Sequence, residues 1–140
     1  MEVGMSEKNV ALQRRFVEEY QTGRDESVAD EILAEDFVNH AEVPGLPTDR
    51  EGVKILFRAF WTAFPDFRME IHDMFGAGDR VATRKTFRGT HDGEFTGIPP
   101  TGRMVGVDII DIVRYEDGKL AEHWNVVDQL GLMRQLGVVE

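Results

Sequence analysis

The stretch MVGVDIIDIVRYEDGKLAEHWNVVD, residues 104–128, indicates most directly what kind of fold this chain forms. Its two halves, residues 104–115 and 119–128, carry many of the apolar and β-branched side chains that favour strands. The Asp117–Gly118 pair between them suits the tight turn of a hairpin. We therefore predict two neighbouring antiparallel strands in this part of the chain.

The alternation with a period of two that marks strands extends back from this hairpin to Pro65. Two earlier strands are predicted at residues 68–75 and 80–91, joined by a turn at 76–79. The stretch DGEFTGIPPTGR separates these strands from the hairpin as a loop. QLGLMRQLG, which follows the hairpin, predicts a short closing helix.

Before Pro65 the apolar residues recur every three or four positions, which predicts helices. Either Asp25 or Ser27 is expected to cap the second helix, and Thr48 with Glu51 has the spacing of a capping box at the start of the third. The three helices expected are residues 6–22, 25–36 and 48–64. Since no repeat or linker divides the chain, we predict one α+β domain over residues 1–140.

Composition argues against several classes of protein. The 26 acidic and 16 basic residues give a net charge of −10, which repels nucleic acid and anionic membrane surfaces. The lack of cysteine removes thiolate catalysis, thiolate zinc sites and disulfides, and the four histidines lack metal-binding spacing, so we expect no metal site. The sequence shows neither a signal-peptide pattern nor an apolar run of membrane-spanning length, which predicts a cytoplasmic protein.

Five motifs in order carry a resemblance to a known family. They are FVNH at 37–40, AFPDF at 63–67, GTHDGEFTGIPPTGR at 89–103, DGKLAEHWNVVD at 117–128 and MRQLG at 133–137. With these motifs the chain resembles the SnoaL-like polyketide cyclases, or ester cyclases, of the nuclear-transport-factor-2-like superfamily. The resemblance implies a cone-shaped α+β barrel of the cystatin-like kind, with a hydrophobic cavity for a small polyketide-like ligand at its open end. It also implies a homodimer formed through the sheet and chemistry without a cofactor.

The resemblance further implies a reaction, an intramolecular aldol condensation that closes a ring in a polyketide methyl ester. This reaction needs a base that removes a proton beside a carbonyl group and a donor that stabilises the oxyanion. The aspartate of the family's aldol cyclases corresponds to Asn125 here, and their histidine corresponds to Asp111. We therefore interpret Asp111 as the base, because burial raises the pKa of a carboxyl group, and Asn125 as the donor. Tyr20 matches a position where the family carries an aromatic residue that faces the substrate.

The segment EHWNVVD, residues 122–128, predicts a pocket wall. His123 and Asn125 share one face of a strand, and Trp124 lies on the other. A regular hairpin would place Asp111 opposite Trp124, on the side away from His123. Bringing Asp111 to the same side as His123 therefore requires a one-residue bulge or a longer turn. In this hypothesis the shared cavity is closed by Tyr20, Phe57 and Trp61.

Each candidate residue also has an ordinary structural interpretation. Asp111 is compatible with a solvated, outward-facing position, and His123 with a purely structural hydrogen bond. Asp128, a further catalytic candidate, suits the N-cap of the closing helix. The remaining substrate-binding candidates are His40 and His91, which lie at or near loops, and Trp61 and Trp124, which also suit a core or a cavity wall.

Three functions remain open from the sequence. The first is a cofactor-free enzyme that acts on a ketoester by enolisation, as a cyclase or an isomerase. The second is a protein that binds an apolar small molecule without converting it, which Asn125 in place of the aspartate favours. The third is an epoxide-opening hydrolase with an Asp–Arg–Asp arrangement, for which Arg84 would have to supply the arginine from a neighbouring strand.

Overall fold

The computed structural model describes residues 4–41 and 43–139. Its strands form one five-stranded sheet in the order β1-β5-β4-β3-β2, in which β1 is parallel to β5 and the other neighbours are antiparallel. The fold is α+β, as the sequence predicts. The elements are α1 (Met5–Arg15), η1 (Phe16–Thr22, a π-helix), α2 (Glu26–Ile32), β1 (Leu33–Asn39), α3 (Arg50–Ala63), β2 (Arg68–Ala77), β3 (Arg80–Thr90), β4 (Met104–Glu116), β5 (Lys119–Val127) and α4 (Gln129–Leu136).

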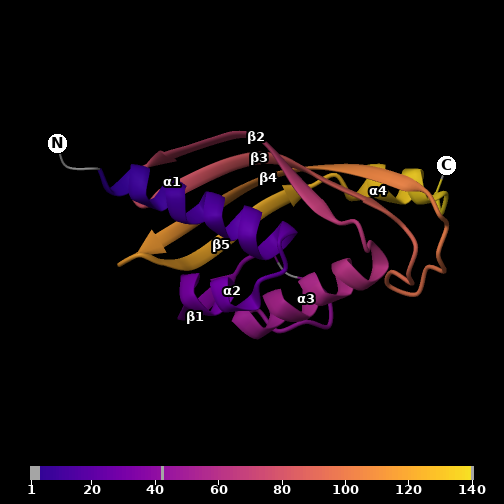
Figure 1. Cartoon of the computed structure of the whole chain (residues 1–140), viewed down its shortest axis with the longest axis horizontal. Coiled ribbons are helices and arrows are strands. Elements are labelled where there is room, and N and C mark those ends of the chain that lie inside the picture. Colours follow the sequence, from indigo (N-terminus) through magenta and orange to yellow (C-terminus); the bar gives the residue numbers. More distant parts are fainter. Residues whose placement is uncertain (1–3, 42, 140) are drawn as a thin grey trace.

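The sheet is curved, and α1, α2 and α3 gather on one side of it (Figure 1). We call that side of the sheet the inner face and the opposite side the outer face. Along β4 every second residue is buried against the inner-face core, while Ile110 and Ile112 point outward and are 56% and 41% exposed. The inner-face residues of β4 are Val105, Val107, Ile109, Asp111, Val113 and Tyr115.

The first predicted helix is present, but its second half is a π-helix. In η1 the residues Phe16, Val17, Tyr20 and Gln21 are all buried. The wider turn of a π-helix is uncommon and is often found at functional sites. Here it brings both an aromatic and an amide side chain to the inner face.

The second predicted helix is shorter than expected. Asp25 caps α2 by accepting from the Ser27 amide, and the helix ends at Ile32. Residues 33–36 belong instead to β1, which the sequence analysis missed. The residues of β1 do not alternate between apolar and polar as in a typical strand. β1 is extended because it pairs with β5, for example at Asn39 and His123, so a distant part of the chain determines its conformation.

The predicted capping box of the third helix is wrong by one residue. Asp49, not Thr48, is the N-cap of α3, and its carboxylate accepts from the Gly52 amide at 3.2 Å. The loop before β4 is tied to the other end of this helix. Gly93 donates to Ala63 O, and a Cβ at Gly93 would lie 2.3 Å from Thr62 O, so this approach needs glycine.

The hairpin between β4 and β5 contains both the predicted turn and the bulge that the pocket hypothesis requires. Asp117 and Gly118 both have positive φ, 50° and 76°, as a type I′ turn demands. Next to the turn Tyr115 pairs with Leu120, but the next pair is Arg114 with Glu122, so Ala121 is the extra residue. Beyond this bulge every β5 side chain points to the face opposite to the one a regular ladder would give it.

Within residues 4–41 and 43–139, no helix is both long enough and apolar enough to cross a membrane.

Candidate active site

Three titratable side chains from neighbouring strands, Lys85, Asp111 and His123, lie on the inner face, and the bulge at Ala121 is what turns His123 to that side. Asp111 of β4 pairs with Asn125 of β5, and His123 pairs with Val113 on the same side. Asp111 Oδ2 lies 2.8 Å from Lys85 Nζ of β3 and 3.6 Å from His123 Nε2. The side chains of Lys85 and Asp111 are only 2% and 3% exposed, whereas that of His123 is 20% exposed. The site is therefore a buried ion pair with a more accessible histidine beside it.

Lys85 has a second partner on the π-helix. Its Nζ donates to Gln21 Oε1 at 3.2 Å, and Gln21 is buried on η1. The Gln21 carbonyl in turn accepts from Trp61 Nε1 at 2.9 Å, which fixes that residue's backbone against α3. The ammonium group thus contacts a carboxylate on one side and a neutral amide on the other.

The ion pair determines the protonation state of Asp111. Burial by itself would raise the pKa of Asp111, but the charge of Lys85 and the contact and charge of His123 outweigh it and lower the pKa to about 2. The expected direction of the shift, upward through burial, is therefore reversed. Asp111 is a carboxylate at neutral pH and a weak base.

His123 is held from both sides. Asn39 Oδ1 accepts from the Ala41 amide at 3.0 Å and lies 2.9 Å from His123 Nδ1. Because that oxygen is an acceptor, Nδ1 carries the proton and donates, and Nε2 faces Asp111. One nitrogen of the ring is thus held by Asn39, and the other faces the carboxylate.

Two polar atoms of this face, Asp111 Oδ1 and Thr83 Oγ1, are buried without a hydrogen-bond partner among the described residues. Tyr20 OH is also buried without such a partner, in the aromatic core between η1 and α3. Thr83 is the β3 residue directly opposite Asp111, so its hydroxyl lies on the same face. Buried polar groups are normally paired, so the inner face retains capacity to bind a polar group of a ligand.

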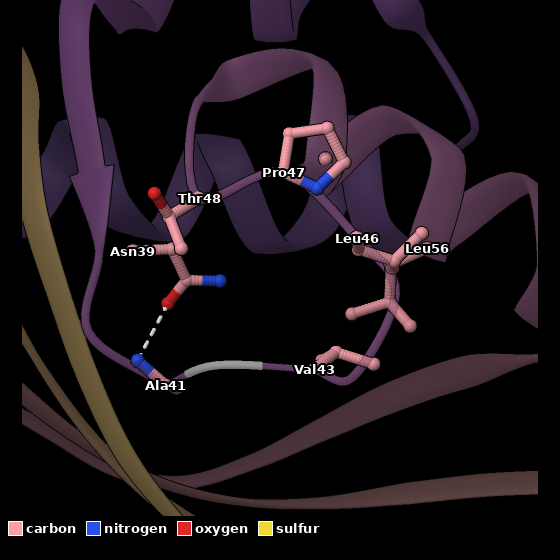
Figure 2. Close-up of a pocket in the computed structure, with 8 residues that line it drawn as sticks. Asn39, Ala41, Val43, Leu46, Pro47, Thr48 and Leu56 are labelled. Atoms are coloured by element: carbon pink, nitrogen blue, oxygen red, sulfur yellow. Dashed lines mark hydrogen bonds between the residues drawn. The ribbon is translucent and has the colours of Figure 1, made fainter.

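Asn39 also joins the histidine to a small pocket (Figure 2). The volume of this pocket is about 10 Å³, roughly the room of one water molecule. Its lining residues are Asn39, Ala41, Val43, Leu46, Pro47, Thr48, Gly52 and Leu56. The pocket therefore has no room for a larger ligand.

The residues expected to close the cavity pack against one another. The Tyr20 ring lies 5.5 Å from that of Phe57 and 5.6 Å from that of Trp61, and Tyr20 is fully buried. They belong to the aromatic part of the core between η1 and α3. Asn125 faces the inner side opposite Asp111 but is exposed to solvent.

Other predicted site residues lie elsewhere. Trp124 pairs with Ile112 and is on the outer face, where the ring of His40 stacks on it at 4.9 Å. The same bulge that brings His123 inward turns Trp124 outward, so the Trp124 and His40 rings do not face Asp111, although the His40 amide donates to His123 O at 2.9 Å. Asp128 is the N-cap of α4, because its carboxylate accepts from the Gly131 amide at 2.9 Å.

His91 is buried under the loop that precedes β4, away from the ion pair. Its Nδ1 accepts from the Thr101 amide at 3.3 Å, and its ring lies 5.5 Å from that of Phe64. His91 therefore anchors the loop to the core. Arg84 is on the outer face, where it pairs with Asp73 at 2.6 Å, so the Asp–Arg–Asp arrangement of the hydrolase hypothesis has no arginine here.

Four residues of the site were not predicted from the sequence, namely Lys85, Gln21, Asn39 and Thr83. For Lys85 a signal was present, since Val81, Thr83, Lys85 and Phe87 alternate on β3 and the lysine therefore falls on the face of the apolar residues. Asn39 gave no comparable signal, because its role depends on the parallel pairing of β1 with β5. Across the described ranges, no group of three or more His, Cys, Asp or Glu side chains is placed to hold a metal ion.

Comparison with known proteins gives consistent matches over most of the chain. The family model for SnoaL-like polyketide cyclases matches residues 11–136. Aklanonic acid methyl ester cyclase AcmA of Streptomyces galilaeus is 34% identical over 137 residues, which cover 95% of this chain and 92% of AcmA. Aklanonic acid methyl ester cyclase DauD of Streptomyces sp. (strain C5) is 33% identical over 132 residues, or 91% of this chain and 81% of DauD.

Solved structures match the fold as well. The crystal structure of IdmH from Streptomyces antibioticus has a TM-score of 0.80 at 34% identity and covers 92% of this chain and 98% of IdmH. The fold is thus shared with IdmH, and similarity of sequence extends to AcmA and DauD. The chain belongs to the SnoaL-like polyketide cyclase family and has its nuclear-transport-factor-2-like α+β fold.

Proposed function

We propose that this chain is an ester cyclase that closes a ring in a polyketide methyl ester by intramolecular aldol addition, without a cofactor. The observation that carries the proposal is the inner-face pair of His123 and Asp111, a histidine able to exchange a proton beside a buried carboxylate. The relatives support the substrate class, since AcmA and DauD are aklanonic acid methyl ester cyclases.

The reaction consists of two proton transfers and one new carbon–carbon bond. A base removes a proton from the carbon between the ester carbonyl and a ketone, and the enolate carbon attacks a second ketone of the same molecule. The alkoxide that forms takes up a proton. The product is an isomer of the substrate that retains its methyl ester, so atoms and electrons balance without a further reactant.

We assign both proton transfers to His123. Asn39 fixes the proton on Nδ1, and Nε2 lies 3.6 Å from Asp111 Oδ2, too far for a hydrogen bond, so Nε2 can accept the proton from the substrate. The Asp111 carboxylate, 3.6 Å away, stabilises the imidazolium that forms, and Nε2 then returns the proton to the alkoxide. This assignment replaces Asp111 as the base, because the ion pair with Lys85 makes that carboxylate too weak a base.

We assign the stabilisation of the oxyanion to neutral hydrogen-bond donors. The Asn125 amide stands on the inner face opposite Asp111, and the Tyr20 hydroxyl has no partner among the described residues. Both can donate to a carbonyl oxygen as its negative charge develops. The fully buried hydroxyl is the stronger candidate, since a donor away from water needs no reorganisation to act.

The test is turnover of aklanonic acid methyl ester by the wild type and by His123→Gln, followed chromatographically. Loss of the base should lower kcat by about 10²- to 10⁴-fold and leave KM within a few-fold. His72→Gln is the matched control, because His72 lies on β2 and contacts Thr86, not the site. A His123→Gln variant as fast as the wild type would remove His123 from the reaction.

The alternative is a binding protein that does not convert its ligand. Asn125, at the position that corresponds to the aspartate of the aldol cyclases, favours it. The same assay separates the two, since a binding protein retains ligand affinity and leaves the ester unchanged over hours at high protein concentration.

We also propose that residues 1–140 form one domain and that two copies associate through the outer face. Large apolar side chains on that face are exposed, among them Phe75, Ile110, Ile112 and Val126. Phe75 lies in register with Ile112 across β3, and Val126 pairs with Ile110, so the four form a continuous patch. An apolar patch of this kind suits an isologous contact with a second copy.

A further inference from the structure

Lys85 is a cation in the interior of the protein. It stands on the inner face of β3 between Thr83 and Phe87, with only 2% of its side chain exposed. Removing an ammonium group from water costs several kcal/mol, which must be offset by its partners. Those partners are Asp111 at 2.8 Å and Gln21 at 3.2 Å. A fold that needed only an apolar core would place a leucine or a methionine here.

The two oxygens of Asp111 have different surroundings. Oδ2 faces two groups, the Lys85 ammonium from β3 and the His123 ring from β5. Oδ1 has no hydrogen-bond partner among the described residues. Tyr115, further along β4, adds a hydroxyl but no charge at neutral pH, and it donates to Gln13 at 2.8 Å. The packed π-helix contributes the neutral Gln21.

This arrangement leaves Lys85 as the permanent charge that balances Asp111. His123 is more exposed and changes its charge in the proposed reaction, so it cannot balance the carboxylate throughout the cycle. Lys85 has no contact with His123 or with the pocket of Figure 2 among the interactions described. Any effect of Lys85 on the reaction therefore passes through Asp111.

We propose that Lys85 is a positioning residue of this site, which holds Asp111 as an oriented carboxylate so that His123, and not Asp111, exchanges protons with the substrate. The inference rests on the proposed cyclase function for its effect on turnover, but not for its effect on Asp111. Gln21 of the π-helix η1 helps to orient the Lys85 ammonium group by accepting a hydrogen bond from it.

The experiment compares the wild type with Lys85→Met, which removes the charge at similar volume, and with Lys85→Arg, which retains it. The first readout is the ¹³C signal of the Asp111 side-chain carboxyl group as pH varies, assigned with Asp111→Asn. In the wild type this carboxyl should stay ionised down to below pH ~3. In Lys85→Met it should titrate several pH units higher, since burial then acts without a counter-charge.

The second readout is the pH dependence of turnover. In Lys85→Met, kcat at pH ~6 should fall about 10- to 100-fold and recover as pH rises and Asp111 ionises, with KM within about threefold. Lys85→Arg should keep the pH profile of the wild type. A purely structural lysine would instead lower stability in both variants and leave the shape of the profile unchanged.

Two outcomes would overturn the proposal. One is a wild-type Asp111 carboxyl that titrates above its ordinary range, which is measured without substrate. The other is a folded Lys85→Met protein in which Asp111 titrates as in the wild type. If no ester is converted by the wild type, the cyclase function fails, while the carboxyl titration still decides the role of Lys85.

Discussion

The two faces of β4 depart from the usual pattern of a strand in opposite ways. The inner face is buried, yet it carries Asp111 beside the equally buried Lys85. The outer face is open to solvent, yet it carries Ile110 and Ile112, and Val126 beside them is 76% exposed. Buried charge costs stability, and exposed apolar surface adds none. We infer that the inner face serves chemistry and the outer face serves a partner, so the two faces should respond separately to substitution.

Inserting one alanine after Ala121 should have the largest effect, because it exchanges the two faces of β5. With one more residue beyond the bulge, Trp124 turns inward opposite Asp111, and His123 turns outward. We expect turnover to fall more than 100-fold and the free energy of unfolding to drop by several kcal/mol, measured by enzyme assay and urea denaturation. Ala121→Gly, which keeps the residue count, is the control and should retain the wild-type register. An insertion variant with normal turnover would show that the face of His123 does not matter.

The same bulge marks how far the sequence could be interpreted. Strand periodicity and the Asp117–Gly118 turn correctly predicted the hairpin, because both depend on local conformation. Periodicity alone could not decide whether Asp111 faces Trp124 or Asn125, since one inserted residue inverts the answer. The residue that is inserted, Ala121, has nothing in its side chain that announces a bulge.

The missed parts of the site have a common physical cause. β1 is a strand because β5 pairs with it, and Asn39 reaches His123 only through that pairing. Burial alone would raise the pKa of Asp111, but Lys85 lowers it. The protonation state of Asp111 therefore depends on a contact between β4 and β3. Local patterns therefore predicted the elements, whereas the chemistry depended on pairs of residues far apart in the chain.

Acid should weaken the inner face and leave the outer face unaffected. The pKa of Asp111 is lowered to about 2 in the folded chain, below its ordinary value of 3.8. Its contribution to stability is therefore complete above pH ~4 and is lost as pH falls toward 2, an effect on the order of 2 kcal/mol.

Urea denaturation at several pH values measures this contribution. Other carboxylates with lowered pKa values, such as Asp66 and Glu70, add their own acid dependence. The comparison is therefore with the double variant Lys85→Met/Asp111→Asn, which lacks both charges and should show the shallower pH dependence. Equal slopes in the two proteins would mean that the buried pair adds nothing that depends on pH.

A charge on the outer face should act on association alone. Ile112→Lys places a cation in the apolar patch, so we expect the dimer dissociation constant to rise at least 10-fold, while the stability of each subunit changes by less than about 1 kcal/mol. Light scattering over a range of concentrations measures this, with Ile55→Lys on α3 as control because Ile55 is similarly exposed, at 42%. A wild type that scatters with the 15.9 kDa mass of a single chain at all concentrations would refute the outer-face contact.

The smallest effect concerns a single oxygen atom on the inner side. Tyr20 and Tyr115 are both buried, but Tyr115 donates to Gln13 at 2.8 Å, whereas the Tyr20 hydroxyl has no partner among the described residues. Tyr115→Phe should therefore lower the free energy of unfolding by about 1 kcal/mol, because it leaves the Gln13 oxygen unpaired. Tyr20→Phe should leave stability unchanged or raise it by up to about 1 kcal/mol, because it removes an unsatisfied polar atom.

Turnover should respond in the opposite order. If the Tyr20 hydroxyl donates to the oxyanion, Tyr20→Phe loses a transition-state interaction, and kcat falls by about 10-fold or more while KM changes little. Tyr115→Phe, the matched control, should keep kcat within a few-fold, since Gln13 already occupies its hydroxyl. A stabilised but slower Tyr20→Phe protein is what a hydroxyl retained for chemistry predicts, because selection for folding alone would have favoured phenylalanine. An equally active Tyr20→Phe protein would remove Tyr20 from the reaction and leave Asn125 as the remaining donor on the inner face.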